Sequence, residues 1–402
     1  MPLDLGKTML QLDRVSRGLV ADSGHKETRL TAFIEAASKV DAATAIAKTG
    51  YDPDRPFLAA QVLDSLLGSY APVEPPMDWC IVAVDGSHID VDRHLPVGCY
   101  LINMGGCSLT YGSQPDASFF SQPSLYHRPE DLHLTDPSNS AREEPVAGPL
   151  LGLLRTVQEL ERLAQAIAEV PAGLPTLALV DGSLVMWGLS GQGYPPFIKE
   201  AIIQDRLLPA MDRLQEESQH RPLCLAAYVS LPRSAEVVNA ARSSLCPSDL
   251  SQCRNVCNNR RSVQSPCDLS NDFIDRDLFQ RTLDPGCRSA TYQTNSSVPR
   301  ESYGEHQVCF FYLNCGEEIG RIELPQWVAQ DERLLALCHS LILDQCRKGQ
   351  GYPVAISEAH EQAVINGADR QFFKQMLAEA LEREGLPVYT SEKDRSKRTP
   401  WL

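Results

Sequence analysis

The chain has 402 residues, enough for one large domain or two ordinary ones, and its 43% hydrophobic and 22% charged residues are typical of a soluble globular protein. No stretch approaches the roughly 20 apolar residues of a membrane-spanning helix, and the first residues do not read as a secretory signal, so we expect a cytoplasmic protein. The formal net charge of −15 excludes a uniformly basic surface for binding polyanions and favours an ordinary acidic enzyme, a local basic channel, or a partner that supplies the cationic contacts.

The first part of the chain is predicted to be helical up to about residue 70, because apolar residues recur at helical spacing over 30–37. Prolines within 72–76 end this pattern. The continuous apolar run 80–84 then predicts a buried strand that ends in the turn Asp85-Gly86-Ser87.

A second strand with the same ending is predicted about one hundred residues later. Further strands are expected over 99–104 and 108–111, followed by a long loop over 112–144. Residues 150–168 form an amphipathic helix with one apolar stripe. The apolar run 176–180 follows and leads into Asp181-Gly182-Ser183.

The remainder continues to alternate strands with helices, which predicts an α/β fold with a mixed sheet. The expected strands are 223–229, a hairpin of 308–313 with 318–324, and 352–356; the expected helices are 202–217, 234–242, 326–346 and two that start at 358 and 369. Residues 392–398 read as a charged tail.

The repeated strand followed by Asp-Gly-Ser is the first candidate for chemistry. Carboxylates at neighbouring strand ends lie where α/β folds bind ligands, and Asp85 and Asp181 together could share Mg²⁺ or Mn²⁺, which prefer oxygen ligands. The alternative is that Asp-Gly-Ser is only favourable turn chemistry. Two copies after matched strands leave these interpretations about equal.

The helix before Asp181 offers two more carboxylates, Glu159 and Glu161. Glu161 lies beside the apolar stripe, where a carboxylate needs a cation, whereas Glu159 lies on the opposite side. Helical phase therefore favours Glu161. Ordinary surface pairing of both residues is the alternative.

Near the C-terminus, Tyr352 precedes an apolar stretch and His360 lies eight residues later on the next helix. Histidine can bind a metal or move a proton, and a tyrosine hydroxyl can donate to a phosphate oxygen. Taken alone, this stretch is better explained by a glutamate that complements the dipole at a helix N-terminus and by an ordinary surface histidine.

Asp85, a helix glutamate, Asp181, Tyr352 and His360 in this order resemble the motifs of the NurA nuclease family, over about residues 75–385. The resemblance implies a ribonuclease-H-like (PIWI-like) core, Mn²⁺ (or Mg²⁺) dependence and a homodimer. It also implies DNA as substrate and a HerA-type hexameric ATPase that translocates DNA as partner.

Within this resemblance, residues 1–70 are a separate N-terminal helical segment, 386–402 a charged tail, and 246–287 a cysteine-containing insert. The insert departs from the smaller family members. Its four thiols could bind zinc or an iron–sulfur cluster, although their spacing fits neither a zinc ribbon nor a ferredoxin, and unligated thiols are equally expected. These thiols belong to Cys246, Cys253, Cys257 and Cys267.

The resulting hypothesis is a DNA nuclease, chiefly an exonuclease with ssDNA endonuclease activity, that resects ends at double-strand breaks. Asp85 and Asp181, with a helix glutamate and His360, would hold the metal that activates water for in-line attack on phosphorus, and Tyr352 would orient the phosphate. A metallo-phosphohydrolase acting on small phosphoesters and a non-catalytic adaptor of a DNA translocase are the alternatives.

Overall fold

The computed structural model describes residues 4–91, 97–191, 193–247, 270 and 272–386. The chain forms two compact units, each built from segments distant in sequence. The first unit comprises residues 1–71, 231–295 and 310–314, and the second comprises 72–230, 296–309 and 315–402.

In the described part of the first unit, short strands accompany four α-helices. Its first two helices begin at aspartate caps: the Asp4 side chain accepts the Lys7 amide, and the Asp41 side chain accepts the Thr44 amide. The predicted helical segment ends at Thr49, after which the chain is irregular except for two short strands. The helices are α1 (Leu5–Ala37), α2 (Ala42–Thr49), α7 (Glu236–Leu245) and α9 (Asp275–Thr282), and the strands are β1 (Gln61–Val62), β2 (Ser69–Tyr70), β10 (Arg288–Ser289) and β11 (Tyr292–Gln293), with β12 (Val308–Asn314) shared between the units.

A mixed sheet forms the centre of the second unit, in the order β13-β9-β8-β3-β4-β5. β8 runs parallel to both β3 and β9, and the remaining pairs are antiparallel. The predicted α/β class with a mixed sheet is therefore confirmed. The strands are β3 (Trp79–Ile89), β4 (Tyr100–Tyr111), β5 (Asp116–Tyr126), β8 (Thr176–Asp181), β9 (Leu223–Val229) and β13 (Ile319–Pro325).

Two of the sequence predictions for this sheet were wrong. β4 is one strand instead of two, and the predicted loop over 112–144 contains β5, α3 (Pro129–Leu132), β6 (His133–Asp136) and β7 (Asn139–Pro145). β5 is the outermost strand of its sheet and most of its residues are exposed, so it shows no alternation of polar and apolar residues.

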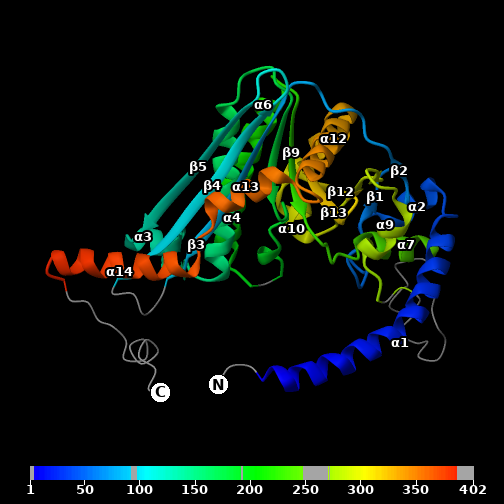
Figure 1. Ribbon diagram of the computed structural model, residues 1–402, viewed down its shortest axis with the longest axis horizontal. Helices are drawn as coiled ribbons and strands as arrows, with labels where there is room; N and C mark the ends of the chain where they lie inside the picture. Colours follow the sequence, from blue (N-terminus) through cyan, green and yellow to red (C-terminus); the bar gives the residue numbers. More distant parts are fainter. Residues whose placement is uncertain (1–3, 92–96, 192, 248–269, 271, 387–402) are drawn as a thin grey trace. The chain divides into compact units, whose positions relative to one another are not determined.

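Helices cover both faces of this sheet (Figure 1). α4 (Pro149–Ala168) packs on β3 with one side and on the helical segment η2 (Glu200–Leu207) and α6 (Leu208–Ser218) with the other. α13 (Val354–Ala363) lies on the opposite face, where the Cys107 thiol contacts the Ala355 carbonyl and Asn103 donates to the Ala363 carbonyl. The other helices are α5 (Pro196–Lys199), α10 (Ser297–Ser302), α11 (Gln326–Gln330), α12 (Glu332–Lys348) and α14 (Gly367–Arg383).

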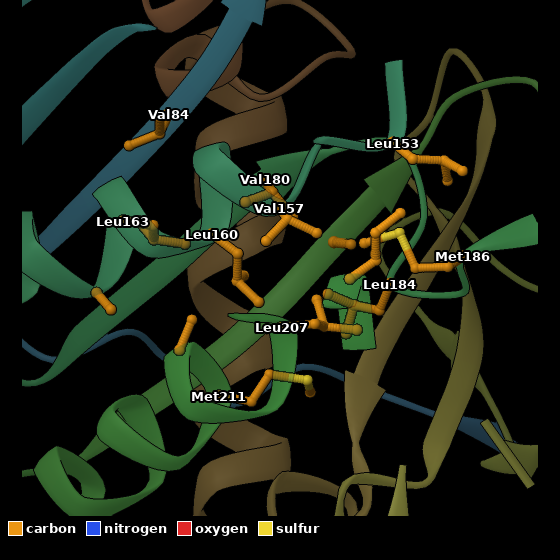
Figure 2. Close-up of a cluster of buried hydrophobic side chains, with 14 of the residues drawn as sticks. Val84, Leu153, Val157, Leu160, Leu163, Val180, Leu184, Met186, Leu207 and Met211 are labelled. Atoms are coloured by element: carbon orange, nitrogen blue, oxygen red, sulfur yellow. The ribbon is translucent and has the colours of Figure 1, made fainter. Parts of the chain in front are cut away.

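The core beneath α4 holds the sheet and the helices together. Figure 2 shows Val84 and Val180 from the strands together with Val157 and Leu160 from α4. Burying each such side chain stabilises the fold by about 1.5–3 kcal/mol. The same packing fixes which residues at the strand ends face away from α4. Within the described part of the chain, no helix has the length and apolar character needed to cross a membrane.

Candidate active site

Asp85 and Asp181 lie at matching positions of neighbouring parallel strands. β3 and β8 pair Val84 with Val180, and the two aspartates are the next residues of each strand. Because Val84 and Val180 face the core beneath α4, and successive strand residues point to opposite faces, Asp85 and Asp181 point toward the α13 side. The structure thus brings the two predicted aspartates together.

The two Asp-Gly-Ser motifs have different backbones. Gly182 has a φ of +95° and turns the chain after β8, as predicted. Gly86 does not form a turn, because β3 continues to Ile89. A Cβ atom at Gly86 would lie 2.7 Å from the Glu159 Oε1 atom, so glycine here leaves room for the α4 side chain.

A buried glutamate that was not predicted from the sequence accepts hydrogen bonds from the turn after Asp181. Glu323, on β13, is 1% exposed and accepts hydrogen bonds from the Ser183 hydroxyl (2.7 Å) and the Leu184 amide (2.9 Å). Arg321 pairs with the same carboxylate at 2.8 Å. Every residue of β13 is buried, so no alternation of exposed and buried positions marks Glu323 as a functional residue in the sequence.

Tyr352 and His360 contact the aspartates on the α13 side of the sheet, the side opposite to α4. The Tyr352 hydroxyl donates to Asp181 Oδ1 at 3.1 Å, and His360 Nδ1 lies 2.8 Å from Asp85 Oδ2. The strand predicted over 352–356 is wrong, since α13 begins at Val354. Pro353 at the helix start and the small residues Ala355 and Ala359 on the buried side explain the helix.

Glu159, and not Glu161, faces the site. Glu159 is 5% exposed, and its Oε1 lies 3.2 Å from the Arg155 Nε. Glu161 instead forms two hydrogen bonds with Arg206 on η2. The helical-phase argument for Glu161 was wrong because α4 is buried on two sides, so its apolar stripe does not define a single inner face.

The site concentrates negative charge. Burial, and then the neighbouring Asp85 and Asp181, raise the pKa of Glu159 to about 8, against the lowering effect of Arg155. Loss of hydration in the cleft, and the charge of Asp85, also raise the pKa of Asp181, which the Tyr352 hydroxyl partly opposes. Burial and Asp181 raise the pKa of Tyr352, so its phenol stays protonated and can donate. A cation would relieve this crowding of carboxylates.

Asp85, Asp181, Glu159 and His360 line a cleft of about 450 Å³. Trp187, which is 42% exposed, forms part of its wall and donates from its Nε1 to the Ser183 hydroxyl. A larger cavity of about 680 Å³ lies around Phe120 and Arg162, away from the paired aspartates. The cleft is lined by Asp85, Gly86, Ser87, Leu153, Arg155, Thr156, Glu159, Asp181, Gly182, Ser183, Val185, Met186, Trp187, His360 and Val364.

The donor set fits a hard divalent cation in its chemistry. It offers carboxylate oxygens from Asp85, Glu159 and Asp181 beside the His360 imidazole. Glu159 Oε1 is buried and, among the described residues, makes no hydrogen bond; its charged neighbour is the Arg155 guanidinium, with Nε at 3.2 Å. Among the residues described here, however, no three His, Cys, Asp or Glu side chains lie close enough to hold an ion as they stand.

The predicted cysteine site falls largely outside the described residues. Cys253, Cys257 and Cys267 are not among them. Cys246 is buried at the end of α7, and its carbonyl accepts from Lys48 at 2.5 Å. The cysteines within the described ranges are all free thiols.

These features define a mixed α/β protein with an acidic cleft beside two parallel strands. Residues 81–365, well over half of the chain, match the family model for the NurA domain. The chain belongs to the NurA family. No curated protein sequence matches it.

Two of the solved structures that are similar to the chain share little sequence identity with it. The crystal structure of the NurA nuclease from Sulfolobus solfataricus has 14% identity, with 79% of this chain and 88% of that chain covered and a TM-score of 0.46. The structure of Aquifex aeolicus Argonaute has 10% identity, with 71% of this chain and 28% of that chain covered and a TM-score of 0.26.

Proposed function

We propose that the chain is a divalent-metal-dependent deoxyribonuclease that hydrolyses phosphodiester bonds in the cleft around Asp85 and Asp181. The observation that carries the proposal is the register-matched pair of aspartates with Glu159 beneath them. Membership of the NurA family and the nuclease named in the Sulfolobus solfataricus structure agree with it. We place the same core with the ribonuclease-H-like folds.

In this proposal, Asp85, Asp181 and Glu159 hold the ion. A bound Mn²⁺ or Mg²⁺ would withdraw charge from the scissile phosphate and lower the pKa of the attacking water. Glu159 must be ionised to act as a ligand, so binding of the ion displaces the proton that burial favours. The mutual repulsion of the carboxylates is the reason that this pocket selects a cation.

The remaining groups position the substrate and move protons. The Asp85 carboxylate accepts from His360 Nδ1, which leaves Nε2 to take or give a proton. The Tyr352 hydroxyl, now on Asp181, is placed to donate to a phosphate oxygen. Arg155 lines the same cleft and donates to the Gly86 carbonyl at 2.9 Å, so its guanidinium offers positive charge to the substrate.

Trp187 favours a polynucleotide over a small phosphoester. Its ring is exposed at the cleft wall, and its hydrogen bond to Ser183 fixes the ring's orientation. An exposed, oriented aromatic ring is the surface on which a nucleotide base stacks. A phosphatase for small phosphoesters gains nothing from such a ring outside the acidic centre.

We further propose that the protein acts as an exonuclease in DNA end resection, as a homodimer with a HerA-type hexameric translocase, and that Mn²⁺ is its preferred ion. The basis is membership of the NurA family together with the net charge of −15. An acidic protein neutralises few phosphates by itself and should bind DNA weakly, so a translocase would supply the missing contacts.

Turnover of DNA compared with a small phosphoester tests the proposed substrate class. End-labelled linear DNA and p-nitrophenyl phosphate are incubated separately with the protein and Mn²⁺, with and without a HerA-type ATPase. We expect faster cleavage of DNA, which the partner increases. Faster turnover of the small ester would contradict the proposal, and absence of both activities with ion and partner present would favour an adaptor.

A further inference from the structure

Two cysteines in the second unit lie in direct contact beside the proposed active site. Cys315 lies in the turn before β13, and Cys346 lies near the end of α12. Their Sγ atoms are 3.3 Å apart. The Cys315 amide donates to the Glu318 carbonyl and closes the turn, so the two thiols are held together by regular structure on both sides.

The two thiols differ in exposure and acidity. Cys315 is partly exposed, whereas Cys346 is fully buried. The hydrogen bond between the two thiols lowers the pKa of Cys315, against the raising effect of burial, and the Tyr228 hydroxyl, 3.5 Å from the Cys315 Sγ, also lowers it. The same hydrogen bond, and then burial, raise the pKa of Cys346. An oxidant therefore meets the more acidic thiol first.

Contacts connect this pair to the proposed site. Tyr228 packs edge-on against Tyr352, with ring centroids 5.4 Å apart and an interplanar angle of 90°. Tyr352 donates to Asp181. The Cys346 carbonyl accepts from the Gly351 amide at 2.7 Å, one residue before Tyr352. Tyr352 is thus linked to both members of the thiol pair, through Tyr228 and through the backbone.

We infer that Cys315 and Cys346 form a peroxide-sensitive dithiol whose oxidation to a disulfide displaces Tyr352 from Asp181. The Cys315 thiolate attacks a peroxide oxygen: the S–O bond forms, the O–O bond breaks, and hydroxide leaves and is protonated to water. The Cys346 thiol then attacks the Cys315 sulfenic acid: the S–S bond forms, the S–O bond breaks, and a second water leaves with the thiol proton. Two thiols lose two electrons and the peroxide gains them.

The geometric consequence follows from the length of the new bond. A disulfide brings the sulfurs to about 2.05 Å, so the turn at Cys315 and the end of α12 must approach each other. Cys315 then loses its thiol hydrogen, its sulfur moves relative to the Tyr228 hydroxyl 3.5 Å away, and the Gly351 amide moves with the Cys346 carbonyl. Both changes act on the segment that places Tyr352.

Formation of the disulfide is tested on the full chain without any assay of activity. The reduced protein is treated with hydrogen peroxide, and intact mass and peptide mapping identify the oxidised cysteines. We expect a Cys315–Cys346 linkage and loss of two hydrogen masses, absent in Cys315→Ser. The fully buried pair Cys224 and Cys338 serves as the internal control and should stay reduced. Reduced Cys315 and Cys346 beside other oxidised cysteines would overturn the inference.

The effect on the site rests on the proposed nuclease function. Oxidised wild type should cleave DNA about tenfold more slowly, as for loss of one hydrogen bond to a charged group, and a dithiol reductant should restore the rate. Cys315→Ser should cleave like reduced wild type and ignore peroxide. A disulfide without change in rate would overturn the link to Tyr352. An inactive reduced protein would count against the nuclease function while leaving the disulfide result intact.

Discussion

Glu159 and Glu161 lie two residues apart on α4, yet their carboxylates have entirely different surroundings. Glu159 is buried next to Arg155 and within the electrostatic influence of Asp85 and Asp181, whereas Glu161 is half-buried and bonded to Arg206. One helix therefore supplies a site carboxylate and a structural ion pair. The two residues form a matched pair for mutagenesis.

Replacing Glu159 by glutamine should remove most of the proposed nuclease activity, whereas Glu161→Gln should retain it. Glu159→Gln removes a charge that faces the cleft, and loss of one such group costs about 10²–10³ in kcat. Glu161→Gln weakens only a partly exposed ion pair, worth at most about 1 kcal/mol of stability. The cleavage rate and the thermal unfolding midpoint of each variant are compared with those of wild type. Equal losses of activity in the two variants would contradict the placement of Glu159 in the site.

Gly86→Ala should disturb the site although it adds only one methyl group. Its Cβ would lie 2.7 Å from Glu159 Oε1 and 2.9 Å from the Arg155 Cγ, so α4 must shift or Glu159 must rotate, at a cost of about 1–3 kcal/mol. Activity and melting temperature should both fall. Gly152 on α4 is the control. A Cβ atom there would have no neighbouring atom within 4 Å, so Gly152→Ala should raise stability by about 1 kcal/mol. A Gly86→Ala protein as stable and active as wild type would show that β3 and α4 are not in this contact.

Tyr352→Phe should lower the rate of DNA cleavage while leaving stability nearly unchanged. The substitution keeps the ring that packs on Tyr228 and removes only the hydroxyl that donates to Asp181. Removing a hydrogen bond to a charged group costs about 1.5–3 kcal/mol, or about ten- to a hundredfold in rate if the bond forms in the transition state. Tyr126→Phe, outside the cleft, is the control. Full activity of Tyr352→Phe in single-turnover cleavage would exclude a role for the hydroxyl.

Asp275 should make the stability of the first unit depend on pH. Burial raises its pKa to about 6, despite hydrogen bonds from the Val238 amide and the Tyr312 hydroxyl. The folded state holds the proton more tightly than the unfolded state. Stability is therefore greatest below the unfolded pKa of 3.8 and falls as pH rises to about 6, on the order of 3 kcal/mol in total.

The variant Asp275→Asn tests this dependence, because asparagine does not titrate. Urea unfolding followed between pH 4 and pH 7, over roughly the interval set by the two pKa values, should show a declining midpoint for wild type and a flatter one for the variant. Parallel curves for the two proteins would mean that Asp275 is ionised without cost in the fold.

The sequence predicted the elements that have a clear period and missed those that do not. The buried strands β3, β8 and β9 and the helix α4 have continuous or periodic apolar residues and were found. β5 is exposed along most of its length, so its pattern is that of a loop. Short-range pattern also failed at 354–356, where apolar residues begin a helix that packs on the sheet instead of a strand within it.

Within the site, the residues identified from motif order lie together, whereas those that depend on three-dimensional packing were missed. The register of β3 and β8 places Asp85 beside Asp181, and one hydrogen bond joins His360 to Asp85. Glu159 needed knowledge that α4 is covered on two sides, and Glu323 acts from a strand more than one hundred residues away in sequence. Neither fact is a property of a local segment.

The central claim is that Asp85 and Asp181 form a metal-dependent centre for DNA cleavage. Its most direct test compares wild type with Asp181→Asn, both shown to be folded, on end-labelled linear DNA with Mn²⁺, with Mg²⁺ and with a chelator. We predict that wild type cleaves only when a divalent ion is present and that Asp181→Asn is slower by about 10²-fold or more. Cleavage by Asp181→Asn at the wild-type rate, or cleavage by wild type in the chelator, would contradict the account.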